Sequence, residues 1–144
     1  MSGENKELIR KLEDAWSKRN LDAIDGFFAS NFDNSATAMP GLPPGIEGAK
    51  MAHRGAMQSF PDRETVIEDL IADGDKVMIR GRYTGTNHGG VPFLNAPANG
   101  NPIDVAFVSI YTIRDGKITE HWGLNDAVAL MQQVGAMPAP AGSA

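Results

Sequence analysis

The sequence predicts an α+β domain in which a curved antiparallel β-sheet wraps three N-terminal helices and leaves an internal pocket. Apolar residues recur every three or four positions before Pro61, as in amphipathic helices, and alternate with polar residues after it, as in strands. Asp73-Gly74 and Asp115-Gly116 each lie between two strand-like segments, where Asp-Gly is typical of a hairpin turn. Helices followed by hairpins favour an α+β layout over repeated βαβ units, and a strongly curved sheet leaves a cavity at its open end.

Three helices are predicted in the first part of the chain. The first, over residues 4–19, carries an apolar stripe at helical spacing, made of Leu8, Ile9, Leu12, Ala15 and Trp16. A second, short helix is predicted over residues 21–30, and a short strand follows over residues 32–37. The third helix is predicted over residues 46–60 and ends before Pro61, because a residue that precedes proline avoids the helical conformation.

Proline and glycine separate the helical part from an antiparallel meander. A loop is predicted over residues 39–48, where three Pro and three Gly interrupt any regular periodicity. The elements expected after it are strands over residues 65–72, 77–86, 103–113 and 118–124, a long loop over 87–101, and a closing helix over 126–134.

Composition excludes several classes of protein. The 144 residues suit one domain, expected over residues 1–136, with a Pro- and Ala-rich tail over 137–144. With no cysteine there is no disulfide framework, and the spacing of three histidines matches no metal motif, so no metal site is expected. The net charge of −5 and the absence of basic runs disfavour nucleic acid. No signal peptide or membrane span is recognisable, so a cytoplasmic location is expected.

Four groups of segments resemble a known family when they are taken in order. They are the first helix with Trp16 and the following LDAIDGFFA; ADGDKV with TGT and His88; IRDGKI; and Glu120-His121-Trp122 with Asp126 and MQQVG. This ordered set, which spans most of the chain, resembles the SnoaL-like polyketide cyclases of the nuclear transport factor 2-like superfamily.

The resemblance implies a cone-shaped fold, an apolar pocket for a small apolar ligand or substrate, and a homodimer. It also implies cofactor-free, intramolecular aldol ring closure, in which one aspartate acts as acid and base. Relatives commonly carry an acidic residue directly after the His-Trp pair, where this chain has Gly123. Asp126, which follows the last strand at the expected mouth of the cone, is the first candidate for the working aspartate. If that aspartate instead aligns with Gly123, where the chain departs from the family pattern, this protein lacks it.

The candidate catalytic residues gather at the last strand and its exit. Because side chains alternate along a strand, Glu120 and Trp122 are expected to face the pocket with Ile118, and His121 the opposite side, unless a bulge near Gly123 reverses them. Asp126 has two interpretations. It is either the acid–base residue in an apolar pocket or the N-cap of the closing helix.

Further candidates lie elsewhere in the chain. His88 follows a strand and is either a donor to a substrate oxygen or an exposed loop residue, and His53 is expected mainly on a helix surface. Asp104 is either an edge residue or a second carboxylate of the pocket. The side chains expected to bind substrate are Trp16, Phe28, Phe107, Trp122 and Asn125.

The leading hypothesis is a cofactor-independent acid–base enzyme of the cyclase type, acting on a mid-sized apolar carbonyl or cyclic substrate. Asp126 would act first, with His88, Glu120 and His121 as helpers. The alternatives are an isomerase or hydratase on the same scaffold, a non-catalytic ligand-binding protein, and a dimerising scaffold. At least two titratable groups in an enclosed cavity would favour an enzyme, whereas a cavity without them would favour a binding protein.

Overall fold

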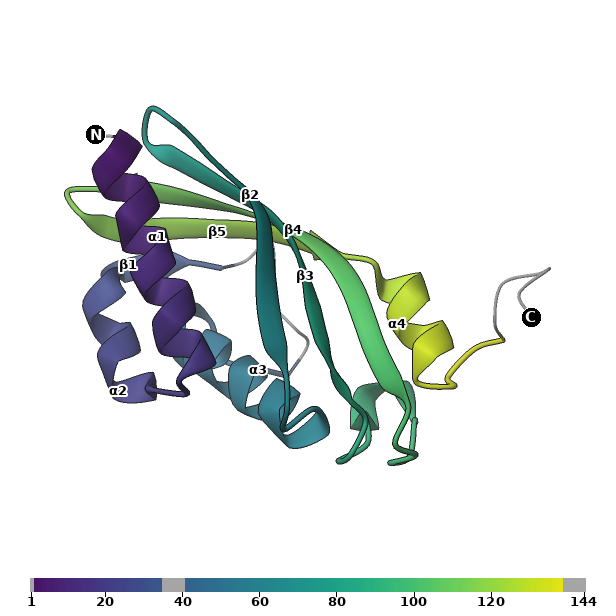
Figure 1. Cartoon of the computed structure of the whole chain (residues 1–144). Coiled ribbons are helices and arrows are strands. Elements are labelled where there is room, and N and C mark those ends of the chain that lie inside the picture. Colours follow the sequence, from purple (N-terminus) through teal and green to yellow (C-terminus); the bar gives the residue numbers. More distant parts are fainter. Residues whose placement is uncertain (1, 35–40, 139–144) are drawn as a thin grey trace.

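The computed structural model describes residues 2–34 and 41–138, which form helices packed against one five-stranded sheet (Figure 1). The elements in chain order are α1 (Ser2–Ser17), α2 (Leu21–Ile24), the 3-10 turn η1 (Asp25–Phe27), β1 (Phe28–Asp33), α3 (Gly45–Ser59), β2 (Glu64–Asp73), β3 (Lys76–Thr86), the 3-10 turn η3 (Pro92–Leu94), β4 (Pro102–Arg114), β5 (Lys117–Asn125) and α4 (Ala127–Gln133). In the described part of the chain, no helix is long and apolar enough to cross a membrane.

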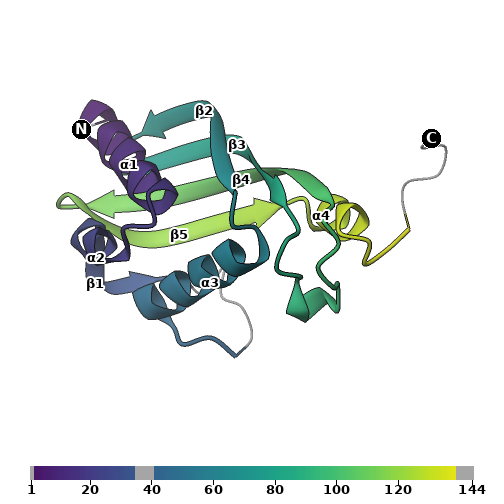
Figure 2. The ribbon, with the colours of Figure 1, turned by 60° about the horizontal axis from the view of Figure 1, so that its bottom comes forward.

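The sheet has the strand order β1-β5-β4-β3-β2. Pairing is antiparallel from β2 to β5, and only the short β1 runs parallel to its neighbour. Gly74 and Gly116 adopt positive φ angles of 59° and 74° in the two hairpins, as the Asp-Gly pairs predicted. Figure 2 shows α1 crossing one face of the sheet and α4 lying at the opposite end of the strands. The α+β prediction and the curved antiparallel sheet are confirmed.

Two hydrophobic clusters hold the helices on the concave face of the sheet. The first joins α1 and α2 to the hairpin ends of β3, β4 and β5, and its fully buried members include Ile9, Leu12, Ile24, Ile79 and Ile118. The second joins α4 and residues 87–101 to the other ends of β3 and β4, around Tyr83, Val91, Ile103, Val105, Leu130 and Val134. The space between the two clusters is where a cavity remains.

The second predicted helix is shorter than expected. It ends as a 3-10 turn over Asp25–Phe27, and the chain is already extended from Phe28, whose ring meets Phe32 edge-on at 4.6 Å between centroids. Pairing of this segment with β5, at Phe28 with Ile118 and at Asp33 with Glu120, overrides the local helical pattern. Parts of three predictions fall outside the described residues: the strand at 35–37, the loop at 39–40 and the tail from 139.

The start of the long 87–101 loop is held against the end of α3. The backbone N–H groups of His88 and Gly89 donate to the Ser59 carbonyl at 3.2 and 3.1 Å. A Cβ atom on Gly89 would lie 1.8 Å from the Gln58 carbonyl oxygen, so only glycine allows this approach. Asn87, fully buried, fixes the loop from within by donating to Pro97 O and Asn99 Oδ1, both at 3.0 Å.

We therefore expect Gly89→Ala to lower the free energy of unfolding by about 1–3 kcal/mol, the usual cost of overpacking. The matched control is Gly55→Ala in α3, where a Cβ would meet nothing within 4 Å. That change should instead stabilise the protein by about 0.5–1 kcal/mol, because alanine favours helix over glycine. Urea unfolding followed by circular dichroism measures both values, and equal effects would contradict the assigned contact.

Candidate active site

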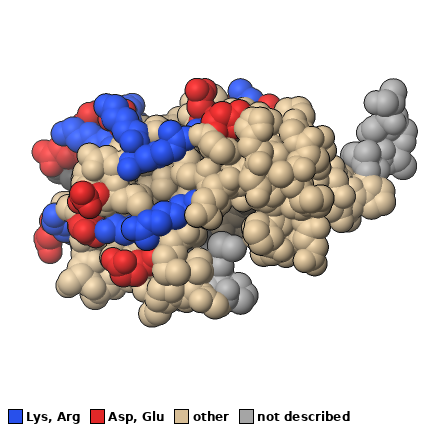
Figure 3. Space-filling view, turned by 90° about the horizontal axis from the view of Figure 1, so that it is seen from below, with Lys and Arg blue, Asp and Glu red and all other residues tan. Residues whose placement is uncertain are grey.

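A cavity of about 510 Å³ lies between the concave sheet face, α1, α3, α4 and residues 87–101. Phe93 and Leu124, each 65% exposed, line its outer part, and Tyr111, Ser109 and Glu13 line its inner part. Figure 3 shows the molecule from below, where charged side chains gather over the helical half and the half toward α4 bears few. The apolar rim and polar interior favour a ligand that is mainly apolar and carries a few polar atoms.

A β-bulge decides which side chains of β5 enter the cavity. Thr112 pairs with Glu120, but the next β4 residue, Ile113, pairs with Ile118, so Thr119 is the extra residue. Ile118 and His121 therefore share the concave face, and Glu120 and Trp122 point to the convex face. The expected orientation of β5 was wrong, because the bulge reverses the alternation at Thr119 and not near Gly123.

His121 is the central imidazole of the cavity. Its Nε2 atom lies 3.0 Å from Ser109 Oγ, and its ring stacks on Tyr111 at 4.5 Å between centroids and 8° between planes. Burial lowers the pKa of His121 to about 4, so the imidazole is neutral at pH 7. Gly123 lies opposite Ser109 in the β4–β5 register, and its missing side chain leaves His121 and Ser109 open to the cavity.

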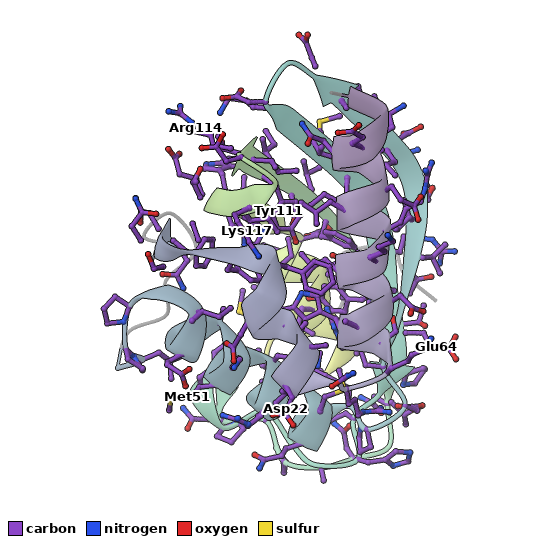
Figure 4. All side chains as sticks on the ribbon, turned by 90° about the vertical axis from the view of Figure 1, so that its left-hand side faces the viewer. Asp22, Met51, Glu64, Tyr111, Arg114 and Lys117 are labelled. Atoms are coloured by element: carbon purple, nitrogen blue, oxygen red, sulfur yellow. The ribbon has the colours of Figure 1, made fainter. Side chains whose placement is uncertain are left out.

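Tyr111 connects the sheet to α1, as Figure 4 shows. Its hydroxyl donates to Glu13 Oε1 at 3.4 Å. Burial raises the pKa of Tyr111 well above its ordinary value, so the hydroxyl keeps its proton. A series of contacts therefore runs along the inner wall, from Ser109 to His121, from His121 to the stacked Tyr111 ring, and from the Tyr111 hydroxyl to Glu13.

Glu13 is the only carboxylate among the described residues that line the cavity. Burial raises the pKa of Glu13, and the Arg63 charge and the Tyr111 hydrogen bond oppose that rise. Such a carboxyl group titrates closer to neutrality than an exposed one, which suits exchange of a proton with a substrate.

A second histidine lies across the cavity on α3. The His53 ring packs on Trp16 at 4.5 Å between centroids, and its buried Nε2 has no hydrogen-bond partner among the described residues. Burial and the charges of Arg63 and Arg19 lower the pKa of His53 to about 4. His53 thus lines the cavity, although a place on the helix surface was expected from the sequence.

The structure separates the sequence-predicted catalytic residues. His121 lies in the cavity, whereas Glu120 and His88 are exposed and outside it. Asp126 is exposed, accepts a 3.0 Å hydrogen bond from the Ala129 N–H and is not among the cavity-lining residues. The structure places Asp126 as the N-cap of α4, the second of its two interpretations. Asp104, in the central strand β4, pairs with Arg82 on the convex face and is not among the cavity-lining residues.

The predicted substrate-binding residues divide in the same way. Trp16, Phe107 and Asn125 line the cavity, and the Asn125 side chain donates to the Tyr83 hydroxyl at 2.9 Å. Phe28 packs in the first hydrophobic cluster, and Trp122 is 43% exposed on the convex face. The bulge explains Trp122, since it turns that side chain away from the cavity.

The most important residues that sequence reasoning missed are Glu13, Arg63 and Tyr111. Glu13 lies four residues after Ile9 and three before Trp16, so it interrupts the apolar stripe of α1. Tyr111 lies on the same face of its strand as Val105 and Phe107. From the sequence, an aromatic residue on that face is expected to be part of the hydrophobic core. Among the described residues, no group of three His, Asp or Glu side chains could hold a metal ion.

Comparisons with known proteins agree with this fold. Among solved structures, TsrD from Streptomyces laurentii is 26% identical with a TM-score of 0.82, covering 94% of this chain and 97% of that one. A candidate polyketide cyclase from Bacillus cereus is 32% identical with a TM-score of 0.79, covering 93% and 82%. AclR, a candidate hydroxylase from Streptomyces galilaeus, is 22% identical with a TM-score of 0.83, covering 99% and 87%, a likeness that shows the fold alone.

A search of curated proteins gives no significant match. The model of one family, described as SnoaL-like polyketide cyclase, matches residues 6–134 and so covers most of the chain. The curved sheet and the helices packed in its concave face agree with this match, and the chain belongs to the SnoaL-like polyketide cyclase family.

Proposed function

We propose that the chain is a cofactor-independent acid–base enzyme that acts on a mid-sized, mainly apolar carbonyl compound. The observation that carries the proposal is the polar series from Glu13 to His121 on the inner wall of an otherwise apolar cavity. Several titratable groups facing one cavity are expected of an enzyme and not of a simple binding protein. Aldol-type ring closure is the reaction that the family suggests.

Glu13 is assigned as the general base. In an aldol closure the base removes a proton from carbon next to a carbonyl group, and a carboxylate in an apolar site is suited to this step. Its raised pKa makes it a stronger base than an exposed glutamate. The Tyr111 hydroxyl holds the carboxylate in place on the sheet side of α1.

His121 and Ser109 are assigned as the donor pair for a substrate oxygen. Gly123 leaves the space beside both side chains free, since a Cβ there would lie 3.3 Å from His121 Nε2 and from Ser109 Oγ. A carbonyl oxygen in that space would accept a hydrogen bond from the pair, and the negative charge of the enolate would be stabilised. The Tyr111 ring stacks on His121, and the Tyr111 hydroxyl contacts Glu13. The Tyr111 side chain therefore lies between the donor pair and the base.

The proposed reaction balances without any added reagent. Glu13 takes the carbon-bound proton, and the C–H electron pair becomes the enolate held by His121 and Ser109. The enolate carbon then attacks a second carbonyl carbon of the same molecule, which forms the ring C–C bond and an alkoxide. The proton returns from Glu13 to the alkoxide, so substrate and product are isomers and the carboxylate is regenerated.

A carbon acid of suitable size tests the proposal before a natural substrate is found. The probe is 5-nitrobenzisoxazole, which loses one carbon-bound proton and opens to a coloured nitrophenolate. We expect saturable turnover whose rate rises with pH through a pKa above that of an exposed glutamate, because only ionised Glu13 acts as base. A rate no higher than that of the same concentration of free acetate would contradict the proposal.

We also propose a homodimer through the convex sheet face. Met78, Ile110 and Trp122 lie beside one another there on neighbouring strands, and Trp122 is 43% exposed. Apolar side chains on an outer sheet face are expected to be covered by a partner. Light scattering at micromolar concentration should give twice the chain mass of 15.4 kDa. Trp122→Glu should give the monomer and Trp122→Phe should not. A monomeric wild-type protein would contradict the dimer.

A further inference from the structure

Arg63 places a positive charge in the cavity. It precedes β2 directly after Pro61-Asp62, and its backbone N–H donates to the Phe60 carbonyl at 3.0 Å, which holds the residue at the end of α3. The guanidinium lies over the Tyr83 ring, 4.7 Å from the centroid, and lines the same cavity as Glu13 and His53.

The guanidinium has no acidic partner within the part of the chain that the structure describes. In that part of the chain, the Arg63 side chain makes no ion pair and no hydrogen bond. Its polar interaction there is the cation–π contact with the Tyr83 ring. Burial lowers the pKa of Arg63, and the nearby Tyr83 and Glu13 act in the opposite direction. By contrast, the convex-face Arg80 and Arg82 each pair with two carboxylates.

Glu13 does not satisfy this charge. Its carboxylate accepts a hydrogen bond from Tyr111, and burial raises its pKa despite the presence of Arg63. A guanidinium presents five N–H donors in a planar fork that matches a carboxylate in a bidentate manner. Half-buried in a cavity without such a partner, Arg63 has the chemistry of a receptor for an anionic ligand group.

The surroundings of Arg63 suit a carboxylate attached to a flat apolar skeleton. His53 remains neutral beside it, since its pKa is lowered to about 4, and its buried Nε2 is also unpartnered among the described residues. The rings of Trp16, Tyr83 and Phe107 line the adjacent walls. An anion bound here would face a cation and neutral aromatic surfaces, and Glu13 is the one acidic side chain among the described residues that line the cavity.

We propose that Arg63 binds a carboxylate of the ligand, so that the substrate is a free carboxylic acid and not its ester or amide. This proposal adds the substrate class to the proposed function. Binding of the carboxylate by Arg63 does not depend on that function, whereas the reaction of the bound acid rests on it. Arg63 fixes the acid end of the substrate, and the remaining skeleton extends along the aromatic walls toward the donor pair and Glu13.

Calorimetric titration with 2-naphthoate and with methyl 2-naphthoate tests the proposal. These probes share a skeleton that fits the cavity volume and differ in charge. We expect the acid to bind wild-type protein at least about tenfold more tightly than the ester, since a charge-assisted bidentate pair is lost in the ester. Arg63→Met should remove the difference by weakening the acid alone, and Arg63→Lys should keep part of it.

The control is Arg114→Met, the same change at an arginine that is 67% exposed at the far hairpin, and it should bind both probes as wild type does. Arg63→Met should also melt at a higher temperature without ligand, because it removes a charge that lacks an acidic partner. Glu13→Gln should still bind the acid, so a failure of catalysis is distinguishable from a failure of recognition. Equal binding of acid and ester, no binding of the acid, or an unchanged preference in Arg63→Met would each overturn the proposal.

Discussion

Replacing Glu13 with Gln is expected to lower turnover of 5-nitrobenzisoxazole by about 10²–10⁴-fold, the usual contribution of one general base. Glutamine keeps the length of the side chain and can still accept a hydrogen bond from Tyr111, but it cannot take up a proton near neutral pH. The same substitution removes a carboxylate whose raised pKa reflects the cost of burying its charge. The melting temperature should therefore stay the same or rise.

Glu7→Gln is the matched control for this experiment. Glu7 is on the same helix and its side chain is 54% exposed in a surface pair with Arg10, so the variant should keep wild-type turnover. Asp126→Asn makes a second comparison, because asparagine also caps helices and Asp126 serves as the cap of α4. If Asp126→Asn lost turnover and Glu13→Gln did not, the acid–base role would return to Asp126 and the assignment made from the cavity would be wrong.

The sequence predicted the elements well because their signals are local. Helical spacing located α1 and α3, and the two Asp-Gly turns located the hairpins to within one or two residues. The short second helix was predicted too long, because the helical spacing of LDAIDGFFA does not reveal that the chain pairs with β5 from Phe28 onward. That pairing depends on residues about ninety positions later in the sequence.

The site was harder to predict, because it depends on long-range pairing. The bulge at Thr119 exists only in relation to β4, and it exchanges the faces of every later residue in β5. His121 was therefore expected on the face away from the cavity that it in fact lines, and Trp122 was expected in the cavity although it lies on the convex face. Glu13 did leave a signal, a carboxylate within an apolar helical stripe, but Arg63 follows a helix end and left none.

Replacing Gly123 with Asp is expected to raise the pKa of His121 by about 1–3 units from its wild-type value near 4. A Cβ at residue 123 would lie 3.3 Å from His121 Nε2, so a carboxylate on it would stand beside the imidazole and stabilise its protonated form.

The shift is measured by following the imidazole Cε1–H signal in NMR as a function of pH, with the signal assigned from its loss in His121→Phe. Gly123→Asn is the matched control, because it has the same shape without the charge and should leave the pKa close to 4. The pH dependence of the free energy of unfolding should report the same change in the pKa of His121. The wild-type pKa of His121 lies below that of an unfolded histidine, near 6.5, so its contribution is complete above pH 6.5 and is lost as the pH falls toward 4.

In Gly123→Asp that acid-induced loss should be smaller than in Gly123→Asn, because the folded state then binds the proton more nearly as the unfolded state does. His53 provides an internal reference within each titration, since its pKa is lowered by burial and by arginine charges on the other side of the cavity. If the Asp and Asn variants gave the same His121 pKa, residue 123 would not face the imidazole. The open space assigned to the substrate oxygen would then have to lie elsewhere on the β4–β5 surface.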